Sequence, residues 1–291
     1  MKMLRLLPLS FLASIPLLFG ALAADTCEMC AIWNAPQRPF GLYGNAYYVG
    51  THGLASVLIT SDKGHILIDG ALPESASQIA AHIKDLGFRL EDIKVILNSH
   101  VHFDHAGGIA ELQRLTNAVV KASPSSAAVL KSGGTSDDDP QHTMLAPIPP
   151  APHVETVKNG ETVSIGPLAL TAHFTPGHTP GGTTWTWDSC QGSRCLHMVY
   201  ADSLNAVSAP DYFFTQNPGT MKGFEHSFST VAALPCDILV SVHPEFSDLW
   251  GRLERRDKGE ADGLVNTSAC KQYVEAARKV FNTRIAKENA K

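Results

Sequence analysis

Short apolar runs separated by polar turns make up much of the chain from residue 54 onward. Residues 54–59 and 65–69 are two such runs, and the Ser-Asp-Lys-Gly sequence between them indicates a hairpin of two strands. Residues 74–86 carry apolar side chains at helical spacing, which predicts a helix. A further strand is expected at 94–97 and a further helix at 109–115. Strands that alternate with helices predict an α/β fold.

The same kind of pattern restarts after a proline-rich and aspartate-rich stretch at residues 132–152. We expect five further strands and a final helix, at residues 162–165, 168–173, 183–187, 196–200 and 238–242 and at about 270–287. Two similar halves whose sheets pack against each other would account for this order, so residues 24–291 are expected to form a single domain. The stretch 132–152 is either a flexible linker or a loop that covers a substrate, and long loops inside compact domains are more often functional.

The first 23 residues have the features of a secretory signal peptide. Lys2 and Arg5 precede an apolar run that ends in the small-residue sequence Ala-Leu-Ala. A membrane anchor is the alternative, but Pro8 and Pro16 interrupt the run, which falls short of the roughly 20 apolar residues that a spanning helix needs. We therefore expect cleavage after Ala23, export to the periplasm and no membrane association after cleavage.

Composition narrows the class of partner. The chain has 291 residues, a formal net charge of −5 and no long basic cluster, which argues against nucleic acid. The part after the signal peptide is long enough to bury a sizeable core. We expect a monomeric protein that acts on a small molecule.

Six cysteines in an exported protein favour disulfides, because the number is even and the compartment is oxidising. They fall into three groups of two: Cys27 and Cys30, Cys190 and Cys195, and Cys236 and Cys270. The first two are spaced like half of a zinc knuckle or a redox pair, but no second such pair accompanies them, so a local disulfide or two free thiols is expected. The middle two could close a hairpin, and the last two are expected to form a long-range pair.

The densest group of metal-ligating side chains follows the strand expected at residues 94–97. Three histidines and an aspartate lie within six positions: His100, His102, Asp104 and His105. Two further histidines, His178 and His243, also come after expected strands. Because α/β folds place their sites beyond the carboxyl ends of strands, we expect these six side chains to converge.

Five histidines and one aspartate are too many for one tetrahedral zinc, since a catalytic zinc takes about three protein ligands plus water. Two Zn²⁺ ions with three ligands each are therefore the expected cofactors. A His-x-His pair on extended backbone points both rings to the same side, so His100 and His102 should share the first ion with His178. The second ion would be held by Asp104, His105 and His243.

Two ions about 3.5 to 4 Å apart can share a water whose pKa falls toward about 7, which gives hydroxide at neutral pH. We expect this hydroxide to be the nucleophile, with the first ion polarising the attacked carbonyl and the second stabilising the leaving group. Asp104 is the candidate catalytic residue, because it could orient the hydroxide and later pass on its proton. Asp69 is expected to brace the ligand loop through hydrogen bonds rather than to bind metal. Three other histidines are weaker candidates for metal ligands, because they are expected in polar surface loops: His142, His153 and His226.

These motifs resemble the metallo-β-lactamase superfamily, and more narrowly the third subclass of class B β-lactamases. The resemblance runs from about residue 39 to residue 286. Its landmarks are Gly-Asn at 44–45, Tyr-Val-Gly at 48–50, Gly-His-Ile-Leu-Ile-Asp at 64–69, the motif at 100–105, Pro-Gly-His-Thr at 176–179 and Tyr-Ala-Asp-Ser-Leu at 200–204. It implies an αβ/βα sandwich with two sheets face to face and helices outside. It also implies two zinc ions and the hydrolysis of penicillins, cephalosporins and carbapenems, which confers antibiotic resistance.

The resemblance also assigns residues. Ser203 stands where the first subclass has a cysteine that binds the second zinc, as in the third subclass. Cys236 and Cys270 match the disulfide of the third subclass. By this resemblance, the substrate-binding residues of this chain are Ser203, Asn205 and Gln141, although relatives have Ser or Thr where this chain has Asn205.

Two other functions compete with this one. A thioesterase or lactonase of the same superfamily is the first, because Asp202 can be aligned with the metal-bridging aspartate of those enzymes, and the sequence leaves open whether Asp202 or Ser203 faces the metals. A zinc-binding protein without catalysis is the second. Structural zinc sites are closed and often rich in cysteine, whereas these six side chains leave coordination positions open.

Overall fold

The computed structural model describes residues 27–290, so the expected signal peptide at residues 1–23 lies outside the described part. Within the described part, no helix is both long enough and apolar enough to cross a membrane. The strands form two sheets, each made from one continuous portion of the chain.

The first sheet contains seven strands in chain order. They are β1 (Phe40–Tyr43), β2 (Ala46–Tyr48), β3 (Val57–Ile59), β4 (His65–Ile68), β5 (Ile93–Leu97), β6 (Val119–Ala122) and β7 (Val154–Thr156). The first four strands pair antiparallel and the last four pair parallel. The expected hairpin is confirmed as β3 and β4. Strand β3 begins at Val57 rather than at residue 54, because Ala55 donates its backbone N–H to the carbonyl of Val242, the residue after β12 (2.9 Å).

The second sheet contains all five strands expected from the second half of the chain. Its spatial order is β12 (Ile238–Ser241), β11 (Arg194–Ala201), β10 (Thr183–Gln191), β9 (Leu168–Phe174) and β8 (Thr162–Ile165). Strands β8 to β11 form an antiparallel meander, and β12 pairs parallel to β11. Both β10 and β11 extend several residues beyond the apolar runs that predicted them.

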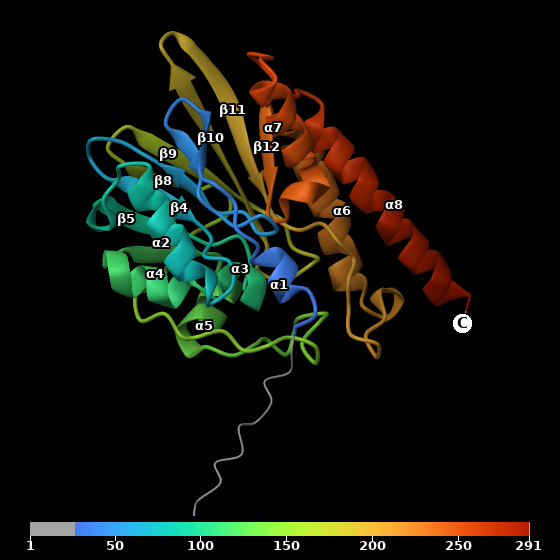
Figure 1. Ribbon diagram of the computed structural model, residues 1–291. Helices are drawn as coiled ribbons and strands as arrows, with labels where there is room; N and C mark the ends of the chain where they lie inside the picture. The colour runs from blue at the N-terminus through green and yellow to red at the C-terminus, as the bar shows by residue number, and fades with distance from the viewer. Residues whose placement is uncertain (1–26, 291) are drawn as a thin grey trace, which may run out of the picture.

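Helices cover the outer face of each sheet (Figure 1). On the first sheet lie α2 (Ser75–Asp85), α4 (Ile109–Thr116) and α5 (Pro124–Ser132), and on the second α6 (Pro218–Ala233) and α8 (Ala269–Asn289). The shorter segments are α1 (Cys30–Trp33), η1 (Leu90–Asp92), α3 (Phe103–Ala106), η2 (Phe214–Gln216), η3 (Pro244–Ser247) and α7 (Leu249–Asp257). This layering is the expected αβ/βα sandwich.

Side-chain alternation along the strands builds the layers. In β4, Ile66 and Ile68 pack into the core between the sheets, while Leu67 packs against the helices of the first half. In β11, Tyr200 faces the core between the sheets and Val199 faces the helices of the second half. Burial on both faces explains why residues 66–68 of β4 and 198–201 of β11 are continuous apolar runs.

Helix α6 did not emerge from the sequence pattern, and the expectation of a polar loop around His226 is wrong, since His226 lies on this helix with its side chain exposed. The helix contains Gly219 and Gly223, which disfavour helical structure by about 1 kcal/mol each. Packing offsets that cost, because Phe224 and Phe228 are fully buried against the second sheet and α8. A start signal was present all the same, as Asn217 is followed by Pro218 at the first helical position.

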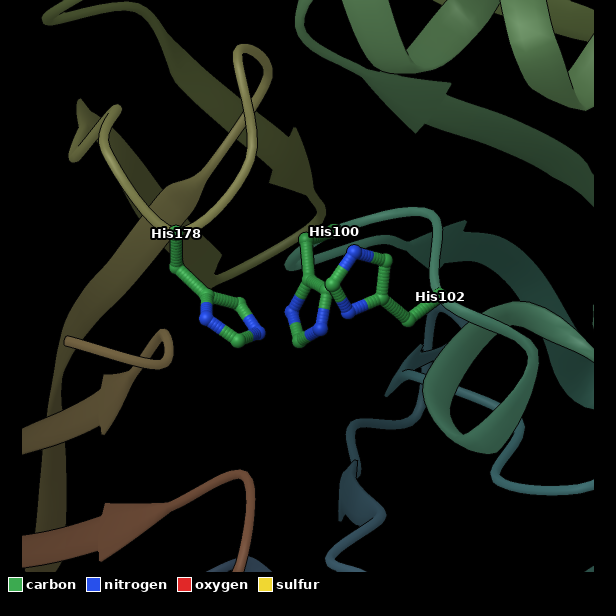
Figure 2. Close-up of side chains that lie close together, drawn as sticks. All are labelled: His100, His102 and His178. Atoms are coloured by element: carbon green, nitrogen blue, oxygen red, sulfur yellow. The ribbon is translucent and has the colours of Figure 1, made fainter. Parts of the chain in front are cut away.

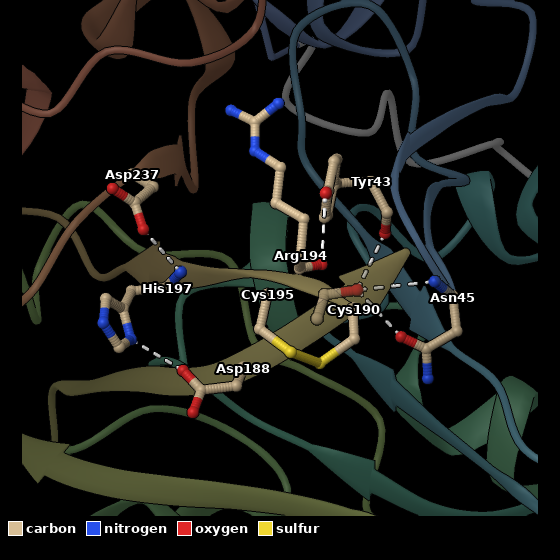
Figure 3. The surroundings of a disulfide bond; sticks show 9 residues. Tyr43, Asn45, Asp188, Cys190, Arg194, Cys195, His197 and Asp237 are labelled. Atoms are coloured by element: carbon tan, nitrogen blue, oxygen red, sulfur yellow. Dashed lines mark hydrogen bonds and ion pairs between the residues drawn. A yellow bond between two sulfur atoms is a disulfide. The ribbon is translucent and has the colours of Figure 1, made fainter. Parts of the chain in front are cut away.

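All six cysteines form disulfides, in the pairs Cys27–Cys30, Cys190–Cys195 and Cys236–Cys270. The middle bond closes the far end of the β10–β11 hairpin (Figure 3). Next to it, Ser189 Oγ donates to the carbonyl of Tyr43 (2.8 Å), so the hairpin end is fastened to the first sheet as well. The last bond joins the segment before β12 to the start of α8.

Removal of Cys236–Cys270 should destabilise the protein more than removal of Cys190–Cys195. The sequence separations are 34 and 5 residues, and the longer closed loop restricts the unfolded chain more. We expect the double Cys→Ala variants to lose about 3 to 4 and about 2 kcal/mol of unfolding free energy, respectively. Urea denaturation of the two variants checks the order, and a reversed order would contradict this account.

Candidate metal centre

The motif at residues 100–105 lies between β5 and α4. His100 and His102 stand on the extended segment that leaves β5, and Asp104 and His105 lie in the short helix α3. The loop is fixed from within, because Asn98 donates its side-chain N–H to the carbonyl of His100 (2.6 Å). All four side chains are buried.

The other two histidines reach the same place from the second sheet. His178 lies in the turn between β9 and β10, where Gly177 has a φ of 140° and a Cβ would lie 2.8 Å from the Phe224 ring. Only glycine fits this conformation and this contact without strain. His243 follows β12, and its ring packs against the ring of Trp33, with centroids 5.3 Å apart.

The six side chains form two groups of three. In each group one ligand atom per residue lies within 4.8 Å of the others: His100, His102 and His178 in the first, and Asp104, His105 and His243 in the second. Figure 2 shows the three rings of the first group directed into one shared space from two different loops. The groups adjoin, since the ring centroids of His100 and His105 are 4.4 Å apart. The side chains thus come together in the grouping expected from the sequence, and metal binding by each group stays a prediction.

Most of these rings are held by a hydrogen bond on the nitrogen that faces away from the group. His100 Nδ1 contacts Asp202 Oδ1 (2.7 Å), and His102 Nε2 contacts Asp139 Oδ2 (3.0 Å). His178 Nδ1 contacts the carbonyl of Asn205 (2.8 Å), and His243 Nδ1 that of Gly53 (3.2 Å). Such contacts fix the ring and its tautomer in metal sites.

The donor set fits a divalent metal ion. Within the described part of the chain, His100 Nε2 is buried without a hydrogen-bond partner, although its other nitrogen is engaged. In the second group, Asp104 Oδ2 lies 3.2 Å from His105 Nε2 and 3.3 Å from His243 Nε2. Imidazole nitrogens with a carboxylate suit zinc.

Burial and mutual proximity set the charge states of this cluster. Burial, together with His105 and His102, holds the pKa of His100 well below its usual range. Burial and the nearby His102 lower the pKa of His178 to about 3. Burial alone would raise the pKa of Asp104, but His105 and His243 hold it well below its usual range. His100 and His178 are thus neutral and Asp104 ionised at neutral pH, the states in which these groups bind metals.

Asp69 braces the ligand loop as expected. Its carboxylate accepts hydrogen bonds from the backbone N–H (2.8 Å) and the hydroxyl (2.5 Å) of Ser99, and from the Tyr200 hydroxyl (2.9 Å). Burial raises the pKa of Asp69 to about 7, although these hydrogen bonds act in the opposite direction. The contact with Tyr200 also joins the two sheets beside the cluster.

Asp202 and Ser203 take different positions. Asp202 is fully buried behind His100, on the side away from the shared space, whereas Ser203 lines an open cavity. Among the described residues neither belongs to a group of metal-ligating side chains. A bridging ligand would have to lie between the two groups, and Asp202 does not lie there.

The cavity beside the two groups has a volume of about 300 Å³. The three residues carried over as substrate contacts, Gln141, Ser203 and Asn205, all line it. So do four of the six candidate ligands: His102, Asp104, His178 and His243. The rest of the wall is formed by Met29, Trp33, Phe103, Leu145, Val207, Glu245 and Phe246. Because Gln141 and Leu145 come from the stretch 132–152, that stretch is a loop at the cavity rather than a linker.

Several residues of the site were not found from the sequence. Asp139 and the carbonyls of Gly53 and Asn205 hold ligand rings, and Trp33 packs on His243. Backbone carbonyls carry no sequence signal. Asp139 does lie in the Asp-Asp-Asp-Pro sequence of the loop, but nothing in its spacing indicates His102 as its partner.

Solved structures with this fold establish the family. The Rm3 metallo-β-lactamase is 55% identical and superposes with a TM-score of 0.89, over 91% of this chain and 99% of that one. The chain belongs to the metallo-β-lactamase superfamily. The model of that superfamily matches residues 49–191. MEM-A1, a subclass B3 metallo-β-lactamase from a soil metagenome library, is 50% identical, with a TM-score of 0.87 and coverage of 89% of this chain and 99% of that one.

The curated relatives are more distant in sequence. A hydroxyacylglutathione hydrolase from Maricaulis maris is 29% identical over 55% of this chain and 51% of its own length. An N-acyl homoserine lactonase from Bacillus cereus is 26% identical over 43% of this chain and 54% of its own length. The chain thus spans about half the length of the curated relatives it matches.

Elemental analysis after dialysis against zinc tests the two groups separately. We expect two zinc ions per chain in the unaltered protein and one in each of His178→Ala and His243→Ala, because each substitution removes a ligand from one group only. His226→Ala, whose exposed side chain lies on α6, serves as the control and should retain two. Full zinc content in both ligand variants would refute the assignment.

Proposed function

We propose that this protein hydrolyses the amide bond of β-lactams, including penicillins, cephalosporins and carbapenems, and so confers resistance to these antibiotics. The observation that carries the proposal is the pair of adjoining three-ligand groups at the wall of an open cavity. The likeness to metallo-β-lactamases over nearly their whole length supports the choice of substrate. An open cavity beside the ligands also favours catalysis over zinc storage.

We propose two zinc ions as cofactors, one in each group. When bound, zinc lowers the pKa of a coordinated water and polarises a carbonyl group. The protein keeps the ligand rings neutral and fixed, through burial and through the hydrogen bonds on their far nitrogens. Rings that are already oriented need no reorganisation when the ion binds.

Asp104 is the residue proposed to move the proton. Its side chain is 9% exposed at the cavity wall, and its carboxylate is ionised at neutral pH. A carboxylate in this position can orient the attacking water, accept its proton and deliver that proton to the ring nitrogen as the C–N bond breaks. The water oxygen ends on the former carbonyl carbon, and the opened ring leaves as an amino acid.

Gln141, Ser203 and Asn205 are proposed to bind the substrate. They supply polar hydrogen-bonding groups at the cavity wall, and Gln141 Nε2 is buried without a hydrogen-bond partner among the described residues. The apolar part of the wall suits the hydrophobic substituents that β-lactams carry. Two of its members, Phe246 and Val207, are 45% and 44% exposed, so they are accessible to a ligand.

A thioesterase or lactonase activity is the second candidate, because the curated relatives include hydroxyacylglutathione hydrolases and acyl homoserine lactonases. Two observations weigh against it. The likeness to those relatives is lower and covers about half their length. The carboxylate of Asp202 is held against the far nitrogen of His100, not between the two groups.

We also propose that the protein is exported to the periplasm and acts there as a monomer. Three disulfides involving all six cysteines favour an oxidising compartment. The sequence at residues 1–23 supplies the export signal in this proposal.

Turnover of a chromogenic cephalosporin is the direct test. We expect hydrolysis by the zinc-loaded protein, loss of at least 100-fold in rate after a chelator, and recovery when zinc is restored, because bound zinc would both lower the pKa of the attacking water and polarise the attacked carbonyl. A glutathione thioester and an acyl homoserine lactone are assayed alongside. If either is cleaved while penicillin, cephalosporin and carbapenem are all left intact, the second candidate replaces the first.

Asp104→Asn should reduce kcat/KM by about 10² to 10⁴-fold, since the amide keeps the shape of the side chain but cannot accept the proton. Its unfolding free energy should change far less than its rate. Asp62→Asn, at an exposed position in the β3–β4 turn, is the matched control and should keep full activity. Equal activity of Asp104→Asn and the control would rule out the assigned role.

A further inference from the structure

Asp139 lies in the loop of residues 132–152, yet its carboxylate reaches a candidate metal ligand. Oδ2 is 3.0 Å from Nε2 of His102, and the two side chains are 1% and 4% exposed. Within the described chain it is one of two carboxylates that contact rings of the first group, Asp202 on His100 being the other. Asp202 follows a strand of the sheet, whereas Asp139 belongs to a segment without helix or strand.

The other oxygen of Asp139 organises the loop itself. Oδ1 accepts the backbone N–H of Gln141 at 2.8 Å, and the carbonyl of Asp139 accepts the N–H of His142 at 3.0 Å. Pro140 lies between Asp139 and Gln141, and its carbonyl accepts the backbone N–H of Ala209 at 2.8 Å. The tip of the loop is therefore fastened to the ligand on one side and to the segment after Asn205 on the other.

From these contacts we infer that Asp139 is a positioning residue that couples the first metal site to the loop that carries Gln141. The bond to Asp139 uses Nε2 of His102 and leaves Nδ1 for the metal. A metal held by that nitrogen would fix the ring and make Nε2–H a stronger donor, so Asp139 and the loop would be held more firmly. The coupling is reciprocal, so a substrate that holds Gln141 in place also strengthens metal binding at the first site.

This inference rests on the metal site of the proposed function, but not on its substrate. Its readouts are metal affinity and backbone protection, neither of which requires a β-lactam to be hydrolysed. A protein that binds zinc and spares β-lactams would overturn the proposed substrate and leave the coupling intact. A protein that binds no zinc would overturn both.

Asp139→Ala is the primary variant, and Asp138→Ala is its matched control because Asp138 is an exposed neighbour in the same loop. Zinc affinities are measured by competition with a chromophoric chelator. We expect Asp139→Ala to raise one of the two zinc dissociation constants by about 10 to 100-fold, the usual effect of losing a hydrogen-bond partner of a metal-binding histidine. Asp138→Ala should stay within twofold of the unaltered protein.

Hydrogen–deuterium exchange of the peptide covering residues 132–152 gives the second readout. Zinc should slow its exchange in the unaltered protein and in Asp138→Ala, and should leave it unchanged in Asp139→Ala even at saturating zinc. Asp139→Asn, which keeps the shape and one acceptor oxygen, serves if the alanine variant does not fold, and should weaken zinc at least threefold. Zinc affinity within twofold of the unaltered protein in a folded Asp139 variant, or a loop peptide that zinc does not protect in the unaltered protein, would overturn the inference.

Discussion

The carboxylate of Asp69 connects the two sheets at the edge where all six candidate ligands emerge. It accepts two hydrogen bonds from Ser99, the residue before His100, and one from Tyr200 of the second sheet. Its backbone has a φ of 59°, a conformation that most non-glycine residues avoid, although aspartate tolerates it better than most. Those three hydrogen bonds help to hold a strained turn, and the turn sets where the ligand loop begins.

Further contacts across the same edge support that connection. Thr183 donates its backbone N–H to the carbonyl of Ser99 at 2.8 Å, and Trp185 donates its indole N–H to the carbonyl of Asn98 at 3.1 Å. Both donors belong to β10, the strand that follows His178. The loop that carries four candidate ligands is therefore hydrogen-bonded to β10, the strand next to the candidate ligand His178. These bonds help to keep ligand atoms from segments far apart in sequence within 4.8 Å of one another in each group.

The sequence was sufficient to predict the layered α/β architecture, and it also predicted which six side chains come together in two groups, whose role as metal ligands stays a prediction. Residues 66–68 of β4 and 95–97 of β5 are buried on both faces and so appear as short apolar runs, while His100 and His102 stand two apart on extended backbone. What it could not reveal depends on tertiary contacts. Helix α6 contains two glycines and forms because Phe224 and Phe228 are buried, and the support from Gly53, Asn205 and Asp139 arises only once distant loops meet.

The six candidate ligands come from widely separated parts of the chain, so the two groups become complete only late in folding. Four of the six belong to the first sheet's half, His178 follows β9, and His243 follows β12, beyond Cys236 of the long-range disulfide. A chain that has assembled only its first sheet offers an incomplete chelate, open to water and to competing ions. If these side chains bind metal as proposed, both groups would be complete only after the last strand has docked. A full set of bound ions would then mark a completely folded chain, because a chain halted earlier in assembly would lack at least one ligand of the second group.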